Sequence, residues 1–355
     1  MPADSLHDYL SQQGAQFGDV AGEQVVQNYG DTNAEHRALI ESVALVDLSF
    51  RGCLAVLGDD RVKFINGQVT NEVAGLKPGQ GCYAALVNAK AKMQADLHVY
   101  RLDDELILDF EPGLLEAVTE RLESHIIADQ VELIDASPHF GLLSLQGPKT
   151  ADALASFGLA LPGEPFAHAK SPLDGLGEVY VMNNGRYGTT GCDLYIPTGH
   201  LGEAAERLAK AVAEQGGPLA GWQATEVARV EAGIPRFGID MGNNTLPPEA
   251  NLETRAISYT KGCYIGQEII ARIRTYGRVN RTLVGYRLEA DLASGTQLTD
   301  DSGKTVGTLT SVIDSPRFGP IALGLAKRGS ETPGQVLTAR EPAQGQATVA
   351  EIPFR

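Results

Sequence analysis

The pattern of hydrophobic residues changes near Asn280, and this change constrains the fold of the 355-residue chain more than any other feature. Before it, strand-like stretches alternate with amphipathic helical stretches such as residues 114–127 and 201–214. After it, about six short strand-like stretches lie between Gly, Pro and Asp turns, at residues 282–288, 297–299, 305–313, 321–326, 336–338 and 348–352. The pattern predicts an α+β region followed by a small C-terminal β-barrel.

The α+β region shows a similar order of elements twice, without a sequence repeat. Its strand-like stretches are residues 53–57, 81–87, 97–101, 106–110, 131–134, 139–145, 179–182 and 194–196. Helices are predicted after Asp59 and over residues 33–45, 114–127, 150–157 and 201–214. This order predicts two ferredoxin-like antiparallel α+β units. A chain of this length is also too long for one ordinary core.

The chain is acidic, with a formal net charge of −16. Stable nucleic-acid binding is therefore not expected, because affinity for phosphates comes from clustered Lys and Arg. One stretch is locally basic, with Lys261, Arg272, Arg274, Arg278 and Arg281. Such a patch on an acidic protein predicts an anionic ligand. The alternative is that these side chains pair with neighbouring carboxylates on a solvated face.

The sequence also argues against a metal site, a membrane span, a targeting segment and the common nucleotide-binding and hydrolase motifs. The four cysteines, Cys53, Cys82, Cys192 and Cys263, form no C-x-x-C pair, so a resident metal site is not expected. No run approaches the roughly 18 apolar residues of a membrane span. The first residues resemble neither a secretory signal nor a transit peptide, which predicts a cytoplasmic location. Phosphate-loop, dinucleotide-binding and G-x-S-x-G motifs are absent from the sequence.

Residues 261–268, Lys-Gly-Cys-Tyr-Ile-Gly-Gln-Glu, place a cysteine just before a predicted helix that begins near Gly266. A helix N-terminus and the nearby Lys261 both favour a thiolate at Cys263, and such settings can lower a cysteine pKa from about 8.5 to roughly 3.5–7.5. The backbone N–H groups of the helix end could also hold an anion. The alternative is a small apolar cysteine that only packs.

The same eight residues resemble the signature of the YgfZ-type folate-binding proteins, which are bacterial relatives of the glycine cleavage T-protein (aminomethyltransferase). The resemblance extends from about residue 46 to the end of the chain. The stretches that carry it are residues 46–49, 64–71, 228–235, 246–250 and 307–316.

The resemblance implies an arrangement of domains and a cofactor. Three domains would form a ring, with tetrahydrofolate or a derivative as the cofactor. Residues 1–136 with 222–280 would form a discontinuous folate-binding domain, residues 137–221 a second α+β domain, and residues 281–355 the barrel.

The resemblance also implies roles for individual residues. Cys263 would be the functional thiol and Lys261 would lower its pKa, while Gln267 and Glu268 would shape the site. Arg229 lies where the family places an arginine near its folate, and an ion pair with Glu231 or another acid is the structural alternative. Asn66, in the matched stretch 64–71, is predicted to bind the cofactor.

Two stretches depart from the T-protein pattern. T-proteins carry a Gly-Gly-x-x-Asp-Asp-Leu run whose aspartate works at the one-carbon centre, whereas residues 91–97 read Ala-Lys-Met-Gln-Ala-Asp-Leu and keep only Asp96 of the acid pair. T-proteins also carry an acid after Tyr-Thr-Gly, where this chain reads Thr-Thr-Gly-Cys-Asp, so Asp193 would have to substitute.

The leading interpretation is a folate-binding protein that assists iron–sulfur cluster assembly or maintenance in enzymes, including those that modify tRNA, with iron–sulfur proteins as partners. The alternative is a tetrahydrofolate-dependent aminomethyltransferase or demethylating enzyme with Asp96 as the acid/base group. A third class is an interaction scaffold in which Cys263 only packs.

Overall fold

The computed structural model describes residues 2–277, 279–340 and 343–355. The chain divides into two compact units. Unit 1 comprises Met1–Asn66, Glu72–Tyr83 and Leu97–Ala228. Unit 2 comprises Gly67–Asn71, Ala84–Asp96 and Arg229–Arg355. The predicted ring of three domains and its boundaries stay predictions.

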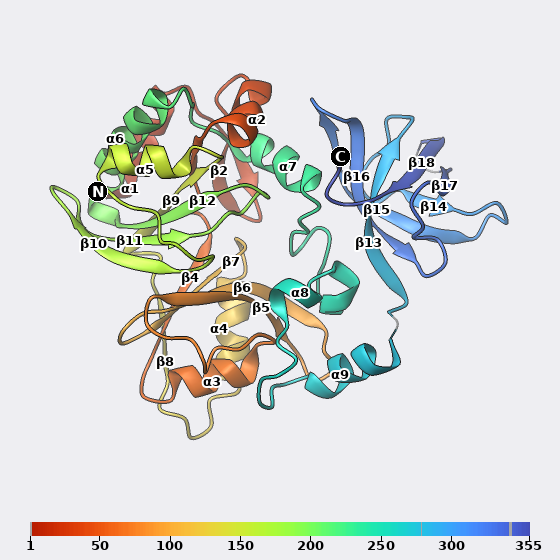
Figure 1. Ribbon diagram of the computed structural model, residues 1–355, viewed down its shortest axis with the longest axis horizontal. Coiled ribbons are helices and arrows are strands. Elements are labelled where there is room, and N and C mark those ends of the chain that lie inside the picture. Colours follow the sequence, from red (N-terminus) through yellow and green to blue (C-terminus); the bar gives the residue numbers. More distant parts are fainter. Residues whose placement is uncertain (1, 278, 341–342) are drawn as a thin grey trace. The chain divides into compact units, whose positions relative to one another are not determined.

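Unit 1 contains an antiparallel sheet of five strands in the order β10-β11-β12-β9-β3. Its strands are β3 (Ala44–Asp47), β9 (Phe140–Gln146), β10 (His168–Leu173), β11 (Gly177–Asn183) and β12 (Gly191–Pro197). The associated helices are α1 (Pro2–Gln12), α5 (Thr150–Phe157), η1 (Thr198–His200) and α6 (Leu201–Glu214). Leu145, Leu194 and Ile196 on the sheet share one apolar core with Leu154 and Leu208 on α5 and α6. Figure 1 shows α5 and α6 beside this sheet. Burial of this face stabilises the layer, because each large apolar side chain contributes roughly 1.5–3 kcal/mol.

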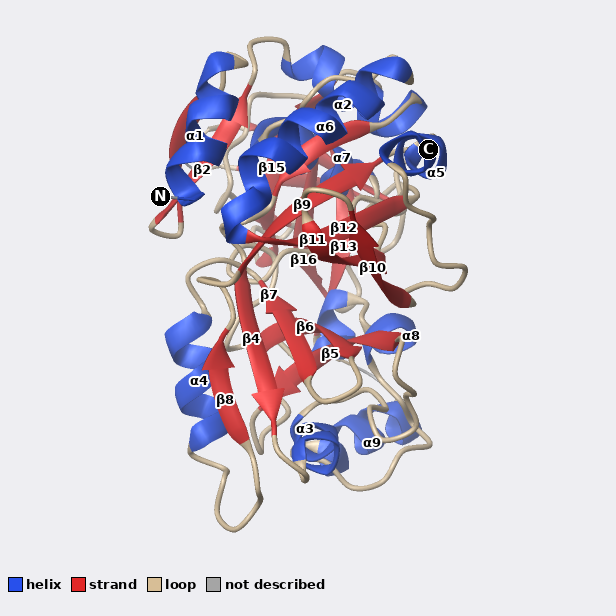
Figure 2. Cartoon of the chain, turned by 90° about the vertical axis from the view of Figure 1, so that its left-hand side faces the viewer, coloured by secondary structure: helices blue, strands red, loops and turns tan. Residues whose placement is uncertain are grey.

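A second five-stranded sheet has the order β5-β6-β7-β4-β8. Its strands are β4 (Gly52–Leu57), β5 (Gln80–Val87), β6 (Met93–Arg101), β7 (Leu106–Phe110) and β8 (Glu132–Asp135). Helix α4 (Leu115–Glu123) packs against β4 and β8, as Figure 2 shows. Val118 and Leu122, the buried residues of α4, lie four positions apart on one helix face. Helix α3 is Arg61–Gln68.

The C-terminal part of unit 2 is a closed barrel with the strand order β13-β16-β15-β14-β17-β18, drawn in blue in Figure 1. Its strands are β13 (Arg281–Leu288), β14 (Gln297–Thr299), β15 (Thr305–Ser315), β16 (Gly319–Lys327), β17 (Val336–Ala339) and β18 (Gly345–Ala350). Tyr286, Leu298, Leu309 and Leu337 fill its interior. Alternate residues of each strand face this interior, as closure of a sheet requires.

Shorter elements complete the chain. They are β1 (Gln16–Val20), β2 (Glu23–Asn28), α2 (Thr32–Glu41), α7 (Trp222–Glu231), η2 (Pro247–Ala250), α8 (Glu253–Ala256) and α9 (Gln267–Tyr276). Among the described helices, none is long and apolar enough to cross a membrane.

The predicted α+β region with antiparallel sheets and a six-stranded barrel is confirmed. The predicted helices at 150–157 and 201–214 have the observed bounds. The predicted helix 33–45 ends earlier, at Glu41, because the following residues form β3 and pair with β9. The sequence prediction missed α1, the β1–β2 hairpin and β10. Strand β10 is an edge strand that is mostly exposed, so it lacks the apolar alternation that marks a strand.

Candidate functional site

The stretch around Cys263 forms a loop of unit 2 that leads into α9. Cys263 is exposed, whereas Cys53, Cys82 and Cys192 are buried. Helix α9 begins at Gln267 with Gly266 as its N-cap, which confirms the predicted helix start. The thiol of Cys263 is therefore open to solvent three residues before the N-cap.

Packing and one glycine hold this loop against the turn between β5 and β6. Tyr264 and Ile270 share a small core with Ala91. Gly266 has φ 83°, and a Cβ there would lie 2.7 Å from the carbonyl oxygen of Asn88. Both the backbone conformation and the close approach require glycine at this position.

Lys261 connects the loop to segment 67–71 by hydrogen bonds. Its side chain is buried, and its ammonium donates hydrogen bonds to the carbonyl oxygens of Val69 at 2.8 Å and Asn71 at 2.6 Å. It also lies over the Tyr264 ring, 5.0 Å from the centroid, where a cation is attracted to the ring face. Burial raises the pKa of Tyr264 to about 12. The lowering of the Cys263 pKa by Lys261 stays a prediction.

Thr70 gives the same segment a second attachment. Its hydroxyl donates to the carbonyl oxygen of Ala256 at 2.6 Å and accepts from the Ala85 N–H at 3.0 Å. The Ser258 N–H donates to the Thr70 carbonyl oxygen at 3.0 Å. Segment 67–71 is thus bonded both to the strand before the β5–β6 turn and to the chain before Cys263.

Arg229 forms a buried ion pair in unit 2. Its Nη1 lies 2.8 Å from Asp240 Oδ2, and its Nη2 donates to the Ser311 hydroxyl at 2.8 Å. Ser311 and Thr310 also donate to Asp240 Oδ1. The structure therefore contains the ion pair expected as the structural alternative, with Asp240 instead of Glu231 as the acid. Direct contact of Arg229 with folate stays a prediction.

The basic patch is only partly available to an anion. Arg272 and Arg274 are exposed on α9, and the Arg274 guanidinium lies 4.1 Å from the centroid of the Tyr259 ring. Arg281 instead pairs with Glu249 at 3.3 Å. Arg278 lies outside the described residues.

A cavity of about 520 Å³ lies beside the end of α9 in unit 2. Its charged lining residues are Arg274 and Arg328 with Glu253 and Glu331. The two arginines and the two glutamates balance, so the lining carries no net positive charge that would attract an anion.

Two predicted site residues of unit 1 have structural partners. The side-chain oxygen of Asn66 accepts hydrogen bonds from the backbone N–H groups of Val73 at 2.9 Å and Ala74 at 3.2 Å. Asp193 is fully buried and pairs with Arg186 at 2.7 Å. Both side chains hold the local chain together, and their predicted contacts with folate stay predictions.

Asp193 belongs to a buried charge network that sequence reasoning missed. Arg186 bridges Asp193 and Asp109, and Arg51 Nε lies 2.7 Å from the Asp109 carboxylate. Burial alone would raise the pKa of Asp109, but Arg186 and Arg51 hold it well below the usual range. His98 Nδ1 also lies 2.9 Å from Asp109. No sequence motif could have revealed the network, because its members come from strands and loops far apart in the chain.

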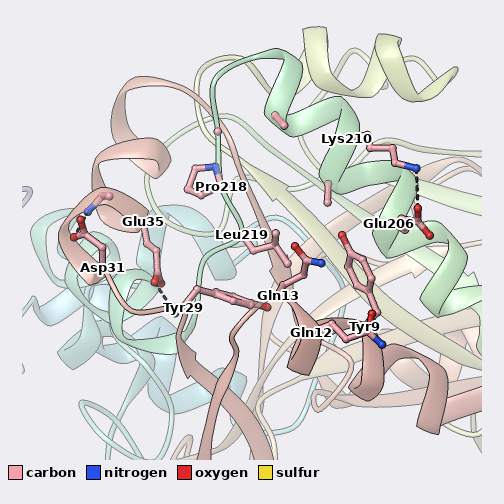
Figure 3. Close-up of a pocket in the computed structure, with 14 residues that line it drawn as sticks. Tyr9, Gln12, Gln13, Tyr29, Asp31, Glu35, Glu206, Lys210, Pro218 and Leu219 are labelled. Carbon is pink, nitrogen blue, oxygen red and sulfur yellow. Dashed lines mark hydrogen bonds and ion pairs between the residues drawn. The ribbon is translucent and has the colours of Figure 1, made fainter.

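Unit 1 also contains a cavity of about 680 Å³ (Figure 3). The rings of Tyr9 and Tyr29 line it, and the Lys210–Glu206 ion pair lies on another side. Glu35 accepts from the Tyr29 N–H at 2.6 Å and so helps to shape the wall. None of the predicted site residues lines this cavity.

No group of three or more His, Cys, Asp or Glu side chains in the described part of the chain could hold a metal ion. The side chains at the sites described above are a thiol, carboxylates, arginines and aromatic rings.

Comparison with known proteins identifies the family. Residues 6–261 match the GCVT N-terminal domain. The chain belongs to the GCVT family. An aminomethyltransferase of Mycobacterium avium is 30% identical over 99% of this chain and 96% of its own length. A putative chloroplastic transferase of Arabidopsis thaliana is 30% identical over 98% of this chain and 79% of its own length.

A solved GCVT structure has the same fold. The crystal structure of the glycine cleavage system aminomethyltransferase T from Bartonella henselae matches with a TM-score of 0.88 at 26% identity, over 99% of this chain and 97% of that one. Aminomethyltransferases of the GCVT family use tetrahydrofolate, the cofactor that the sequence resemblance implied.

The turn between β5 and β6 contains an alanine in a left-handed backbone conformation. Ala91 has φ 56°, in the left-handed region where glycine is favoured. The Asn88 side-chain oxygen accepts from the N–H groups of Lys90 at 2.9 Å and Lys92 at 3.1 Å. These bonds stabilise the strained turn from which β6 leads to Asp96, and Asp96 is half-buried.

Proposed function

We propose that this GCVT-family protein is a tetrahydrofolate-dependent one-carbon transferase that moves an aminomethyl group. Similarity to aminomethyltransferases over nearly the whole of both chains supports this proposal most strongly. The putative Arabidopsis relative is also named as a transferase.

The residues present fit a folate. Its pterin needs aromatic surface and polar partners, and its glutamate tail needs cations. Asp96 supplies a half-buried carboxylate on β6, and Arg272 and Arg274 are exposed on α9. We propose that Asp96 is the acid/base group, that the two arginines bind the tail, and that Gln267 and Glu268 shape the site beside them.

Calorimetric titration of the full chain with tetrahydrofolate tests the proposal. We expect micromolar binding by the wild type and at least tenfold weaker binding by Asp96→Asn, because a buried hydrogen bond to a charged group contributes about 1.5–3 kcal/mol. Asp104→Asn is the matched control, since Asp104 is an exposed acid. Transfer of an aminomethyl group to tetrahydrofolate is then measured with the same proteins. Wild-type protein that neither binds nor transfers would overturn the proposal.

A second candidate function is supported by the exposed thiol. Cys263 is the exposed member of four cysteines and lies in the stretch that resembles the YgfZ signature. On this hypothesis the protein assists iron–sulfur enzymes, including those that modify tRNA, and Cys263 is its functional group. A cytoplasmic location remains the prediction for either function, although the Arabidopsis relative is named as chloroplastic.

One substitution series separates the two functions. Host cells deleted for the gene would carry the wild type, Cys263→Ala or Asp96→Ala, with protein levels checked. Loss of iron–sulfur enzyme activity on deletion, with rescue by Asp96→Ala but not by Cys263→Ala, would favour the second candidate. Full iron–sulfur enzyme activity in the deleted cells would eliminate it.

A further inference from the structure

The cavity of about 680 Å³ in unit 1 is lined from three helices. Helix α1 supplies Tyr9, α2 supplies Glu35 with Asp31 as its N-cap, and α6 supplies Glu206 and Lys210. Every lining residue belongs to unit 1, so the cavity needs no residue of unit 2. Its volume lies in the range of about 300–1,000 Å³ that is typical of small-molecule sites.

The α1 side of the cavity is held in place by the apolar core of unit 1. Leu6 and Leu10 of α1 share this core with Leu208 of α6, and Tyr9 packs against it. Burial of these side chains favours the docking of α1 on α6. The Tyr9 ring is therefore positioned by the fold itself.

Two neutral aromatic rings lie in the middle of the lining. Figure 3 shows Tyr9 and Tyr29 between the α2 side of the cavity and the ion pair on α6. Burial raises the pKa of Tyr9, and Glu206 raises it further while Lys210 opposes the rise. Burial also raises the pKa of Tyr29. Both phenols are thus uncharged at neutral pH, and the faces of such rings attract cations and stack on other aromatic groups.

Glu35 is a buried carboxylate in this lining. It is 2% exposed, and its two oxygens accept hydrogen bonds from the backbone N–H groups of Tyr29 at 2.6 Å and Gly221 at 2.9 Å. Among the residues that the structure describes, no Lys, Arg or His side chain pairs with it. A buried acid without a cationic partner is unusual, because burial of an unpaired charge is costly. The side of the cavity formed by α2 therefore favours a positive charge.

The remaining charges of the lining leave this preference in place. Asp31 accepts the Ala34 N–H at 3.0 Å and, like Glu35, pairs with no cationic side chain in the described ranges. Glu206 and Lys210 neutralise each other at 2.7 Å. Three carboxylates thus face one ammonium group, and the two on the α2 side are without a counterion. An anionic ligand is disfavoured here, and a cationic one is favoured.

We propose that this cavity binds a small organic amine with an aromatic body. The protonated amine lies on the side of Asp31 and Glu35, and the aromatic body packs against the rings of Tyr9 and Tyr29, with Leu219 as apolar wall. This binding site is separate from the transferase function proposed above, because none of the predicted folate-site residues lines the cavity.

Calorimetric titration of the full wild-type chain with three matched ligands tests the inference. The ligands are tryptamine, the neutral alcohol tryptophol and the anion indole-3-propionate, which share the indole ring. We expect a Kd for tryptamine below about 1 mM, as is reasonable for a ligand of this size. Binding of the other two should be at least about tenfold weaker, because they lack the charged donor. Saturating tetrahydrofolate should leave the Kd for tryptamine unchanged.

Variants locate the binding. Asp31→Asn keeps the cap of α2, since Asn caps helices as well as Asp, but removes one negative charge. It should weaken tryptamine binding about fivefold and leave tryptophol binding unchanged. Tyr9→Leu should weaken binding of both ligands, whereas Tyr9→Phe keeps the ring and should change it less than about twofold. Asp152→Asn is the control, because Asp152 is an exposed acid on α5 outside the lining, and it should change neither Kd.

Three results would overturn the inference. They are no tryptamine binding below about 1 mM, equal binding of tryptamine and indole-3-propionate, and displacement of tryptamine by tetrahydrofolate, which would place the amine in the folate site. Each of them leaves the transferase proposal standing, and a protein that binds tryptamine but no tetrahydrofolate would refute that proposal alone. If Asp31→Asn does not fold, the comparison of the three ligands on the wild type decides.

Discussion

Replacing Lys261 with methionine tests whether this lysine holds segment 67–71 in place. The side chain is 6% exposed, and its ammonium makes two hydrogen bonds, to the carbonyl oxygens of Val69 and Asn71. Methionine has a similar length and can still pack on Tyr264, so the main loss is the charged donor. Hydrogen bonds to charged groups contribute about 1.5–3 kcal/mol each. The recovered desolvation energy of the lysine offsets part of this, which leaves a net loss of about 3 kcal/mol.

Native-state hydrogen exchange measures this loss locally. The Thr70 N–H donates to Ala85, and the Ser258 N–H donates to Thr70, so both amides report on opening of the segment. A loss of about 3 kcal/mol corresponds to exchange a little over a hundredfold faster. Lys92→Met is the control, because Lys92 is 31% exposed and its ammonium has one carbonyl acceptor, Asn244. That change should cost less than about 1 kcal/mol.

Two results would refute the reasoning. Exchange at Thr70 that changes less than fivefold in Lys261→Met would show that the two hydrogen bonds do not fasten the segment. A similar effect of Lys92→Met would show that any lysine in the unit acts in the same way. The other predicted role of Lys261 is to lower the pKa of the Cys263 thiol. If it does so, alkylation of Cys263 at pH 7 should be slower in Lys261→Met than in the wild type, because the variant would contain less thiolate.

Three further predictions follow from the packing and the buried charges. Gly266→Ala should lower the free energy of unfolding by about 1–3 kcal/mol, because of its positive φ and the close carbonyl, whereas Gly262→Ala meets open space and should change it little. Asp240→Asn should lower the free energy of unfolding by about 3–5 kcal/mol, because it leaves the Arg229 charge buried without its counterion. Asp109→Asn should lower the free energy of unfolding by a similar amount at pH 7. Its folded-state pKa is depressed, so this contribution is present above the unfolded value of about 3.9 and disappears as the pH falls through the folded value.

Urea unfolding curves measure all three, the last at pH 7 and at acid pH. Equal effects of the two glycine substitutions would contradict the argument from the close carbonyl. Arg317→Ala is the control for the buried pair, because Arg317 is 48% exposed in its pair with Glu231. A cost of Asp109→Asn that stays the same from pH 7 to acid pH would contradict the depressed pKa.

The sequence predicted the parts of the candidate site that lie in one continuous stretch. The helix start predicted near Gly266 is the start of α9, and Cys263 is exposed just before it. Helical periodicity predicted α5 and α6 because their apolar faces are buried. The helix that ends at Glu41 was predicted too long, because the following residues pair with a strand about a hundred residues later. Periodicity in a short window cannot show such a pairing.

By itself, the sequence determined the α+β and barrel classes, the family pattern and the loop that carries the cysteine, because these depend on local periodicity, turn residues and motifs. Only the tertiary structure decided which charges meet. In the structure, Arg229 pairs with Asp240, and Lys261 donates hydrogen bonds to two backbone carbonyl oxygens. His98 forms a hydrogen bond with Asp109. The physical reason is that a buried charge is stable only beside a partner of opposite charge or a hydrogen-bonding group. Packing of the chain decides which partner lies close enough, and the residues next to the charge in the sequence do not show which one that is.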